Sequence, residues 1–356
     1  MLSRRDTLKG GACGLAALSG LFAPAPLVAR VNDPVGFGAA VRPPLLESDA
    51  DYANAIRKYC SIVVPEGGLI WNDLRPDRAT FDFAAADRVA AFAMNSGLRL
   101  RGHTLVWYGV MPSWTESLTS LSLAQDELLK HIDTVVSRYR SRIDSWIVVN
   151  EPLADDAAAF DDLRPTIWQR AIGIDHLAMA FEAAHAADPA AKLFINEYDV
   201  EYTGARFRSR RKALTALIRF LLDRNVPVHG VGLQAHLRGN LTIDVEGLQQ
   251  FAAEMKALGL KIAITELDVI DNKLPADSAE RDRQAAQRAQ TLLAALSDGA
   301  SLDSVLTWGI TDKYTWVPTY FKRADGLKNR PLPLDENYAP KPLMQTIAQF
   351  CTVPGI

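Results

Sequence analysis

Two short segments decide the fold of this chain, Trp146-Ile-Val-Val-Asn-Glu151-Pro152 and Lys261-Ile-Ala-Ile-Thr-Glu266-Leu-Asp268. Each is rich in apolar and β-branched residues, which is typical of a strand buried on both faces of a parallel sheet. Each run reaches a glutamate, and burying a carboxylate is costly unless it does chemistry or is tightly paired. We therefore expect Glu151 and Glu266 to stand at the carboxyl ends of two buried strands.

The rest of the chain repeats this strand pattern, with helical stretches between the strands. Strands are predicted at 36–40, 61–64, 99–103, 145–150, 192–196, 230–234, 261–265 and 304–308. Amphipathic helical periodicity is clearest over 123–139, 168–187, 207–225, 245–258 and 279–296. Eight strands that alternate with helices predict a single (β/α)8 TIM barrel of the α/β class. The segment 320–337 is predicted to be the last long loop, overhanging the catalytic face of the barrel.

Polar and aromatic residues fall at or just beyond the ends of the predicted strands. They are Glu66, His103, Asn150, Glu151, Asn196, Gln234, His236, Glu266, Asp268 and Trp308. In this fold the carboxyl ends of the strands carry the active site, and packing alone would not confine polar residues to one end. Two carboxylates that meet there, about 5–5.5 Å apart, are what a retaining glycosidase needs. Two structural ion pairs are the alternative interpretation of the glutamates.

Composition and charge are ordinary for a globular enzyme: 356 residues, 48% hydrophobic, 23% charged, and a net charge of −3. Because the basic residues are scattered rather than clustered, no nucleic-acid partner is expected. The histidines show no paired spacing, so no metal site is predicted, and no cofactor is expected.

Residues 1–29 are predicted to be an export signal rather than part of the fold. A twin-arginine pair, Arg4-Arg5, precedes an uncharged stretch, which resembles a bacterial twin-arginine signal. The stretch is too short and too rich in Gly and Ala for a transmembrane helix; an amphipathic first helix is the alternative. Cleavage after Ala29, or after Ala25 as the rival site, would release the barrel, assigned to 30–356, into the periplasm or medium without membrane contact.

The cysteines allow two interpretations. Cys60 and Cys351 lie near the two ends of the mature chain, while Cys13 falls within the predicted signal. The first and last helices of a closed barrel are neighbours, so a disulfide is geometrically possible in an oxidising compartment. Two buried free thiols are the other possibility.

Five segments in family order show that the chain resembles glycoside hydrolase family 10, whose usual members are endo-β-1,4-xylanases. The segments are Arg101–Trp107, Trp146–Pro152, Gly230–Leu237, Ile264–Asp268 and Thr307–Trp316. The resemblance runs from about Phe37 to Pro342. It implies a β-linked polysaccharide or oligosaccharide as the substrate.

The resemblance also implies roles for single residues. Glu151 matches the acid/base and Glu266 the nucleophile, and Asn150 matches the residue that hydrogen-bonds the sugar 2-hydroxyl. His236 and Asp268 match the pair that orients and tunes the nucleophile. Glu266 must stay ionised at working pH, so it needs hydrogen-bond donors such as His236 or Gln234.

A second group of residues matches the family's sugar-contacting positions. An aromatic face suits the apolar side of a pyranose ring, so a set of tryptophans is expected to wall the reacting sugar. His103 matches a residue that contacts this sugar, and Tyr198 a position on the leaving-group side. The group consists of Glu66, His103, Trp107, Tyr198, Trp308 and Trp316.

Three positions depart from the family pattern. The second-strand motif usually reads Pro-Glu-Asn-x-Met-Lys-Trp, but here its Asn is Gly67 and its Lys is Ile70. The third-strand motif usually has a Gln where this chain has Val110. In ordinary members these three residues grip the sugar one place beyond the reacting one, on the non-reducing side. We call Gly67, Ile70 and Val110 the altered wall. The alternative explanation is that the three positions changed independently by neutral drift.

The prediction is therefore a retaining β-glycoside hydrolase, foremost an endo-1,4-β-xylanase that acts on xylan or xylo-oligosaccharides. A family member with a changed glycone subsite, cleaving another β-glycoside, is the first alternative. A non-catalytic carbohydrate-binding barrel is the second, although binding alone does not require both carboxylates and their tuning partners.

Overall fold

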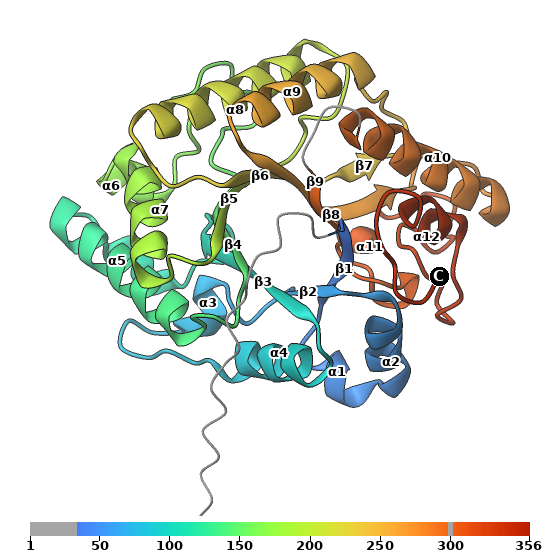
Figure 1. Ribbon diagram of the computed structural model, residues 1–356, viewed down its shortest axis with the longest axis horizontal. Coiled ribbons are helices and arrows are strands. Elements are labelled where there is room, and N and C mark those ends of the chain that lie inside the picture. Colours follow the sequence, from blue (N-terminus) through green and yellow to red (C-terminus); the bar gives the residue numbers. More distant parts are fainter. Residues whose placement is uncertain (1–33, 298–301) are drawn as a thin grey trace, which may run out of the picture.

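The eight predicted strands all form, and they close into a parallel barrel (Figure 1). The structure is a computed structural model that describes residues 34–297 and 302–356. The barrel closes because β1 pairs with both β2 and β9, and β6 pairs with β8. The barrel strands are β1 (Gly36–Val41), β2 (Ile62–Pro65), β3 (Arg99–Val106), β4 (Ser145–Asn150), β5 (Lys192–Glu197), β6 (Gly230–Leu233), β8 (Lys261–Ile270) and β9 (Leu302–Thr307).

One short strand was not predicted. β7 (His236–Arg238) lies outside the barrel and pairs with the second half of β8, in the register His236 with Asp268. β8 therefore runs past Glu266 to Ile270, five residues beyond its predicted end. Residues 266–270 escaped prediction as strand because the polar Glu266 and Asp268 interrupt the apolar run.

Helices surround the barrel in Figure 1. They are α1 (Leu45–Ser48), α2 (Ala50–Tyr59), α3 (Trp71–Leu74), α4 (Ala84–Asn95), α5 (Leu121–Arg138), α6 (Ile167–Ala171), α7 (Asp175–Ala187), α8 (Ala205–Asp223), α9 (Val245–Ala257), α10 (Ser278–Ser297), α11 (Val317–Tyr320) and α12 (Pro342–Ile347), with short 3-10 turns at Ser113–Ser117 and Asp312–Tyr314. The single helix predicted over 168–187 is wrong: Gly173, at φ +82°, separates α6 from α7. Across the two described ranges, no helix is long and apolar enough to cross a bilayer.

The amino end of the barrel interior is closed by a buried ion pair. Arg101 of β3 donates from Nη2 to Asp303 Oδ2 of β9 over 2.7 Å, and both side chains are almost fully buried. Burial alone would raise the pKa of Asp303, but Arg101 and Lys192 lower it to about 2. The opposite, carboxyl end of the barrel is left open for the polar strand-end residues.

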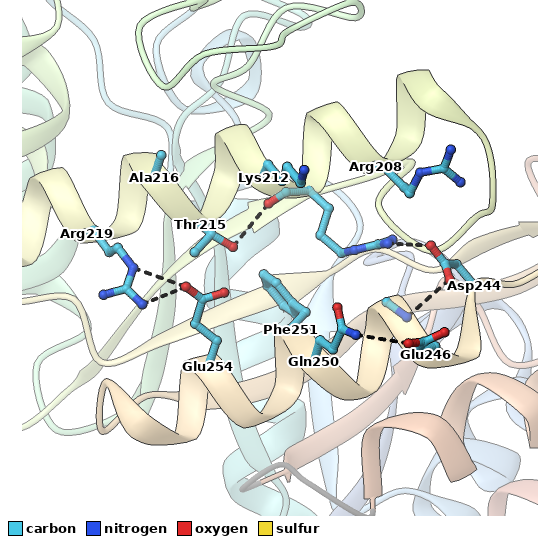
Figure 2. Close-up of a pocket in the computed structure, with 12 residues that line it drawn as sticks. Arg208, Lys212, Thr215, Ala216, Arg219, Asp244, Glu246, Gln250, Phe251 and Glu254 are labelled. Atoms are coloured by element: carbon cyan, nitrogen blue, oxygen red, sulfur yellow. Dashed lines mark hydrogen bonds and ion pairs between the residues drawn. The ribbon is translucent and has the colours of Figure 1, made fainter.

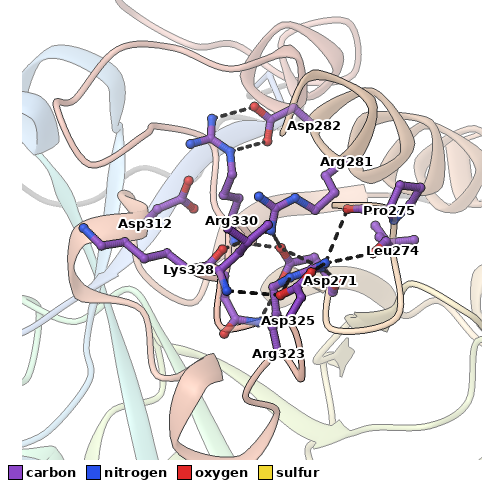
Figure 3. A network of polar contacts seen from close by, with 12 residues as sticks. Asp271, Leu274, Pro275, Arg281, Asp282, Asp312, Arg323, Asp325, Lys328 and Arg330 are labelled. Atoms are coloured by element: carbon purple, nitrogen blue, oxygen red, sulfur yellow. Dashed lines mark hydrogen bonds and ion pairs between the residues drawn. The ribbon is translucent and has the colours of Figure 1, made fainter. Parts of the chain in front are cut away.

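Asp271 directly follows β8 and holds the long segment 320–337 through a network of polar contacts (Figure 3). Its buried carboxylate accepts hydrogen bonds from Asn329 Nδ2 at 2.7 Å, the Arg330 amide at 3.0 Å and Arg281 Nη1 at 3.2 Å. Asn329 also donates to the carbonyl of Phe321 at 3.2 Å. The anchor therefore fixes the stretch whose first residues reach the barrel mouth.

Both described cysteines are free thiols. Cys60 is buried, and Cys351 donates from Sγ to the carbonyl of Ile347 at 3.3 Å. Burial raises the pKa of Cys351 to about 12, so this thiol stays protonated at neutral pH. The free-thiol interpretation is therefore the one that the structure supports. The predicted export signal, 1–29, lies outside the described residues.

Candidate active site

A cleft of about 450 Å³ opens at the carboxyl ends of the barrel strands. Every predicted site residue except Asp268 lines it, namely Glu66, His103, Trp107, Asn150, Glu151, Tyr198, Gln234, His236, Glu266, Trp308 and Trp316. Asp268 is completely buried directly behind the wall of the cleft. The topology thus brings together side chains that are as much as 250 positions apart in the chain, Glu66 and Trp316.

A larger hollow of about 690 Å³ lies elsewhere, on the outer surface between α8 and α9 (Figure 2). Four of its charged side chains form ion pairs, Arg211 with Asp244 and Arg219 with Glu254. None of the predicted site residues lines this hollow. The chemistry-bearing groups therefore point to the barrel mouth, although the hollow between the helices is larger.

Glu151 stands at the turn that follows β4. Its φ of +54° is a left-handed conformation that is uncommon for a residue with a side chain, and its amide donates to the carbonyl of Asn196 at 2.9 Å. The Glu151 Oε1 atom accepts from Gln234 Nε2 at 2.9 Å and from Asn150 Nδ2 at 3.1 Å. These two amides fix the direction of the carboxylate.

Glu266 is held by a different set of donors. Its Oε1 accepts from Asn196 Nδ2 at 2.8 Å, and its Oε2 lies 3.2 Å from His236 Nε2. Burial alone would raise the pKa of Glu266, but the hydrogen bond from His236, the charge of the protonated His236 and the hydrogen bond from Asn196 outweigh it and lower that pKa. Glu266 is therefore ionised at neutral pH although it is only 5% exposed.

The site around Glu266 corrects one sequence prediction. Gln234 does not tune Glu266, because its amide turns toward β4 and contacts Glu151 and Asn150. Asn196 takes that place: its Nδ2 also donates to Asn150 Oδ1 at 2.8 Å, while its Oδ1 accepts from Thr265 at 2.7 Å. Its position at a strand end was the only sequence signal for this role.

His236 lies between two carboxylates. Its Nδ1 is 3.0 Å from Asp268 Oδ2, which also accepts from Trp316 Nε1 at 2.7 Å. Burial opposes the charged imidazole, but Asp268 and Glu266 together hold the pKa of His236 well above its usual value. His236 therefore carries its proton at neutral pH and presents it to Glu266.

Aromatic rings form the two sides of the cleft around these polar groups. Trp308 meets the His103 ring edge-on with centroids 5.1 Å apart, and Trp316 meets the His236 ring edge-on at 5.0 Å. Burial lowers the pKa of His103, so this ring is neutral where it faces the cleft. Flat apolar faces beside fixed hydrogen-bonding groups are the surfaces that a pyranose ring fits.

Several residues at the two ends of the cleft escaped the sequence analysis. Arg42 follows β1 and donates from Nε to both carboxylate oxygens of Glu66 at 2.9 Å. At the other end, Arg164 donates to the Tyr198 hydroxyl at 2.8 Å and fixes that ring. Arg238 also lines the cleft, as do Tyr320 and Phe321 at the start of the segment that was predicted to overhang it. The three arginines gave no sequence signal, because they belong to no motif and only the fold brings them to the mouth.

Two members of the altered wall face into the cleft. Ile70 and Val110 line it together with Glu66, and Gly67, next to Glu66 in the chain, lines a neighbouring cavity. Val110 is 55% exposed, with a φ of +50°. Neither aliphatic side chain can hydrogen-bond a sugar hydroxyl, so these two positions offer a sugar apolar contact only.

Comparison with known proteins agrees with this geometry. Residues 28–350 match the profile of Glycosyl hydrolase family 10. The chain is 36% identical over 320 residues to an endo-1,4-beta-xylanase of Agaricus bisporus, covering 87% of this chain and 89% of the relative. It is 32% identical over 316 residues to a beta-1,4-xylanase of Dictyoglomus thermophilum, covering 84% of each.

Solved structures give the same result. Xylanase 10B from Thermotoga petrophila RKU-1, crystallised in complex with xylobiose, superposes with a TM-score of 0.80 and 28% identity, over 89% of this chain and 94% of that one. Native xylanase 10B from Thermotoga maritima superposes equally well at 30% identity, with the same coverage. Since the profile match, the relatives and the barrel with its two strand-end glutamates all agree, this chain belongs to glycosyl hydrolase family 10.

Proposed function

We propose that this protein is a retaining endo-1,4-β-xylanase in which Glu266 is the nucleophile and Glu151 the acid/base. The observation that carries the proposal is the unequal setting of two carboxylates in one cleft. Glu266 accepts from His236 and Asn196, and its pKa is lowered, which suits a nucleophile that must be ionised. Glu151 accepts from the neutral amides of Gln234 and Asn150 and has no cationic partner as close as the one Glu266 has in His236, so the two carboxylates have different surroundings, as an acid/base and a nucleophile require.

The reaction then takes two displacements. In the first, Glu266 attacks the anomeric carbon and the glycosidic C–O bond breaks, while the proton of Glu151 passes to the departing oxygen. In the second, Glu151 takes a proton from water, the water oxygen attacks the anomeric carbon, and Glu266 leaves as a carboxylate. Each displacement inverts the anomeric centre, so the product keeps the β configuration. In this proposal Asn150 contacts the sugar 2-hydroxyl, and the faces of Trp308 and Trp316 hold the sugar ring.

Xylan is the proposed substrate because relatives that align over most of the chain are xylanases and one structural neighbour holds xylobiose. The test is to incubate residues 30–356 with xylan and with xylo-oligosaccharides. We expect internal cleavage into short oligosaccharides, and proton NMR should show the β-anomer before mutarotation. Early release of the α-anomer would contradict the retaining mechanism, and release of xylose alone would contradict endo action.

A second candidate rests on the altered wall. The side chains of Ile70 and Val110 offer the cleft no hydrogen bond for the second glycone sugar, which suits a β-glycoside with a different or modified glycone. A panel of aryl β-glycosides separates the two functions. Higher kcat/KM on an aryl β-glucoside or another glycone than on the aryl β-xyloside would favour this second candidate over the xylanase.

We also propose that residues 1–29 direct export by the twin-arginine route. The support is the Arg4-Arg5 pair before an uncharged stretch, together with a family match that begins only at residue 28. Changing both arginines to lysine should retain the protein inside the cell. Export that is unaffected by this change would contradict the proposal.

A further inference from the structure

A second cavity adjoins the cleft on the side of the altered wall. It has a volume of about 310 Å³ and lies between the loop after β1, the loop after β2 and the start of α4. Glu66 lines both this cavity and the catalytic cleft, so the two spaces are neighbours on either side of the Glu66 side chain. We call it the Arg42 cavity; it is lined by Arg42, Pro43, Pro44, Glu66, Gly67, Gly68, Asp73, Ala85 and Arg88.

Gly67 keeps this cavity open. A Cβ built at Gly67 would lie 3.2 Å from Asp73 Oδ2, one of the cavity's polar atoms, and would touch nothing else. A longer side chain there, such as the family's usual Asn, would project toward Asp73. Gly68 lets the loop after β2 pack closely against α4. Its φ is +85°, and an added Cβ would come within 2.9 Å of Ala85 and the Ala86 backbone. The substitution that removes one sugar contact therefore also opens a new space.

The cavity presents hydrogen-bond donors and acceptors that are not used by the protein. Arg42 contacts Glu66 through Nε, and its two Nη groups have no partner among the described residues. The Arg88 guanidinium makes a long, weak ion pair: its Nε lies 4.0 Å from Glu47 Oε1 on the exposed surface. Asp73 accepts from the Gly68 amide at 2.7 Å through Oδ2, and among residues 34–297 and 302–356 no group donates to its Oδ1, so this atom is open to a ligand.

The charges in the cavity decide the chemical class of the ligand. Two guanidinium groups, Arg42 and Arg88, stand with two carboxylates, Glu66 and Asp73. A balanced set of this kind does not favour an ion of either sign, but it offers both donors and acceptors to hydroxyl groups. The mixture is suited to a neutral, hydroxyl-rich ligand.

We propose that the Arg42 cavity binds a neutral sugar unit that lies beyond Glu66 on the non-reducing side of the cleaved bond. This inference rests on the proposed xylanase function and names the part of the substrate that replaces the grip lost at the altered wall. The unit is either the next sugar of the main chain or a neutral branch sugar. Both present the same hydroxyl chemistry, so the experiment distinguishes them.

The test compares donors of increasing length with one aryl leaving group: xyloside, xylobioside, xylotrioside, and a xylobioside with a neutral arabinosyl branch. The variants are Arg88→Ala, which removes a donor, and Ala85→Leu, which fills the cavity from α4. Arg57→Ala, on the exposed side of α2 and away from both cavities, is the matched control. Thermal unfolding of each variant confirms that the barrel is intact.

We expect Arg88→Ala and Ala85→Leu to lower the efficiency ratio of a longer or branched donor over the plain xyloside by about tenfold, as the loss of one or two hydrogen bonds would. Arg57→Ala should leave the ratio unchanged. A fall confined to the linear xylotrioside identifies a main-chain sugar, and a fall confined to the branched donor identifies a branch. Ratios that stay unchanged for every donor in both variants would overturn the proposal.

A binding measurement separates this proposal from the xylanase function. Xylotriose and the branched oligosaccharide are titrated calorimetrically into Glu266→Ala protein, with and without Arg88→Ala, so no turnover is required. Binding that weakens with Arg88→Ala while the unmodified enzyme fails to cleave xylosides would refute the xylanase function alone. An oligosaccharide affinity that is unchanged by Arg88→Ala and by Ala85→Leu would refute the role of the cavity alone.

Discussion

The His236 Nε2 atom lies 3.2 Å from Glu266 Oε2, on the side of the imidazole opposite Asp268. The two carboxylates keep the histidine protonated, and the protonated histidine in turn keeps Glu266 ionised. Because β7 pairs with β8 in the register His236 with Asp268, the backbone itself fixes this arrangement. The charge of the proposed nucleophile thus depends on a neighbouring strand rather than on its own.

Replacing His236 by Gln should move the acidic limb of the pH profile of kcat/KM to higher pH. The histidine lowers the pKa of Glu266, so without it that pKa rises, and the active ionised form is lost at a higher pH as the solution is acidified. His185→Gln, on α7 outside the cleft, is the matched control and should leave the limb in place. An unmoved acidic limb in His236→Gln would show that the histidine does not tune Glu266.

Glu266→Ala should abolish turnover, and azide should restore part of it with an inverted product. The reason is that a small anion can attack the anomeric carbon from the face that the carboxylate has vacated. Product anomers are followed by NMR, and unmodified enzyme with azide is the control. Near-normal activity of Glu266→Ala without azide would mean that another group is the nucleophile.

Glu151→Ala should discriminate between substrates by leaving group. An aryl glycoside with a good leaving group needs little protonation, so its first step should survive, whereas xylan hydrolysis should fall by several orders of magnitude. Burst kinetics with the aryl substrate should reveal an accumulating intermediate. If both substrates lose activity equally, Glu151 is not the acid/base.

Restoring the altered wall should restore grip on the second glycone sugar. In the unmodified enzyme we expect little gain in kcat/KM from an aryl xyloside to the aryl xylobioside, and a larger gain after Gly67→Asn, Ile70→Lys and Val110→Gln together. The backbone permits this change: Gly67 does not have a positive φ, and at φ +50° Gln is less strained than the β-branched Val110.

Gly68 must stay unchanged in that experiment, because its φ of +85° disfavours any other residue. Folding of the triple variant is checked by circular dichroism before kinetics. A large xylobiosyl preference in the unmodified enzyme would contradict the prediction and would mean that other cleft residues, such as Tyr320 and Phe321, already hold the second glycone sugar.

Asp271→Ala should destabilise the protein by about 3–5 kcal/mol, measured by chemical denaturation, because it leaves the buried Arg281 without its carboxylate partner. It should also lower activity, since the anchor holds the segment that places Phe321 in the cleft wall. Asp161→Ala, an exposed aspartate, is the control and should change stability by less than about 0.5 kcal/mol. If Asp271→Ala lowers the free energy of unfolding by no more than the control does, the Asp271 network contributes little to stability.

Much of the fold could be predicted because burial shapes the sequence locally. The strand containing Val148 is buried on both faces, and such strands read as apolar runs whatever surrounds them. The bounds of β4 match the prediction residue for residue, while β8 was predicted too short because Glu266 and Asp268 interrupt its apolar run. The break at Gly173 was missed because the apolar periodicity continues through it.

The sequence alone determined which residues gather at the barrel mouth, because the carboxyl ends of parallel strands meet at one end of the barrel. It could not determine which groups contact each other there. That Gln234 donates to Glu151 while Asn196 donates to Glu266 depends on how neighbouring strands are staggered. The Arg42–Glu66 contact and the cavity beside it were likewise decided only by tertiary structure, because they join loops whose local sequence carries no trace of their neighbours.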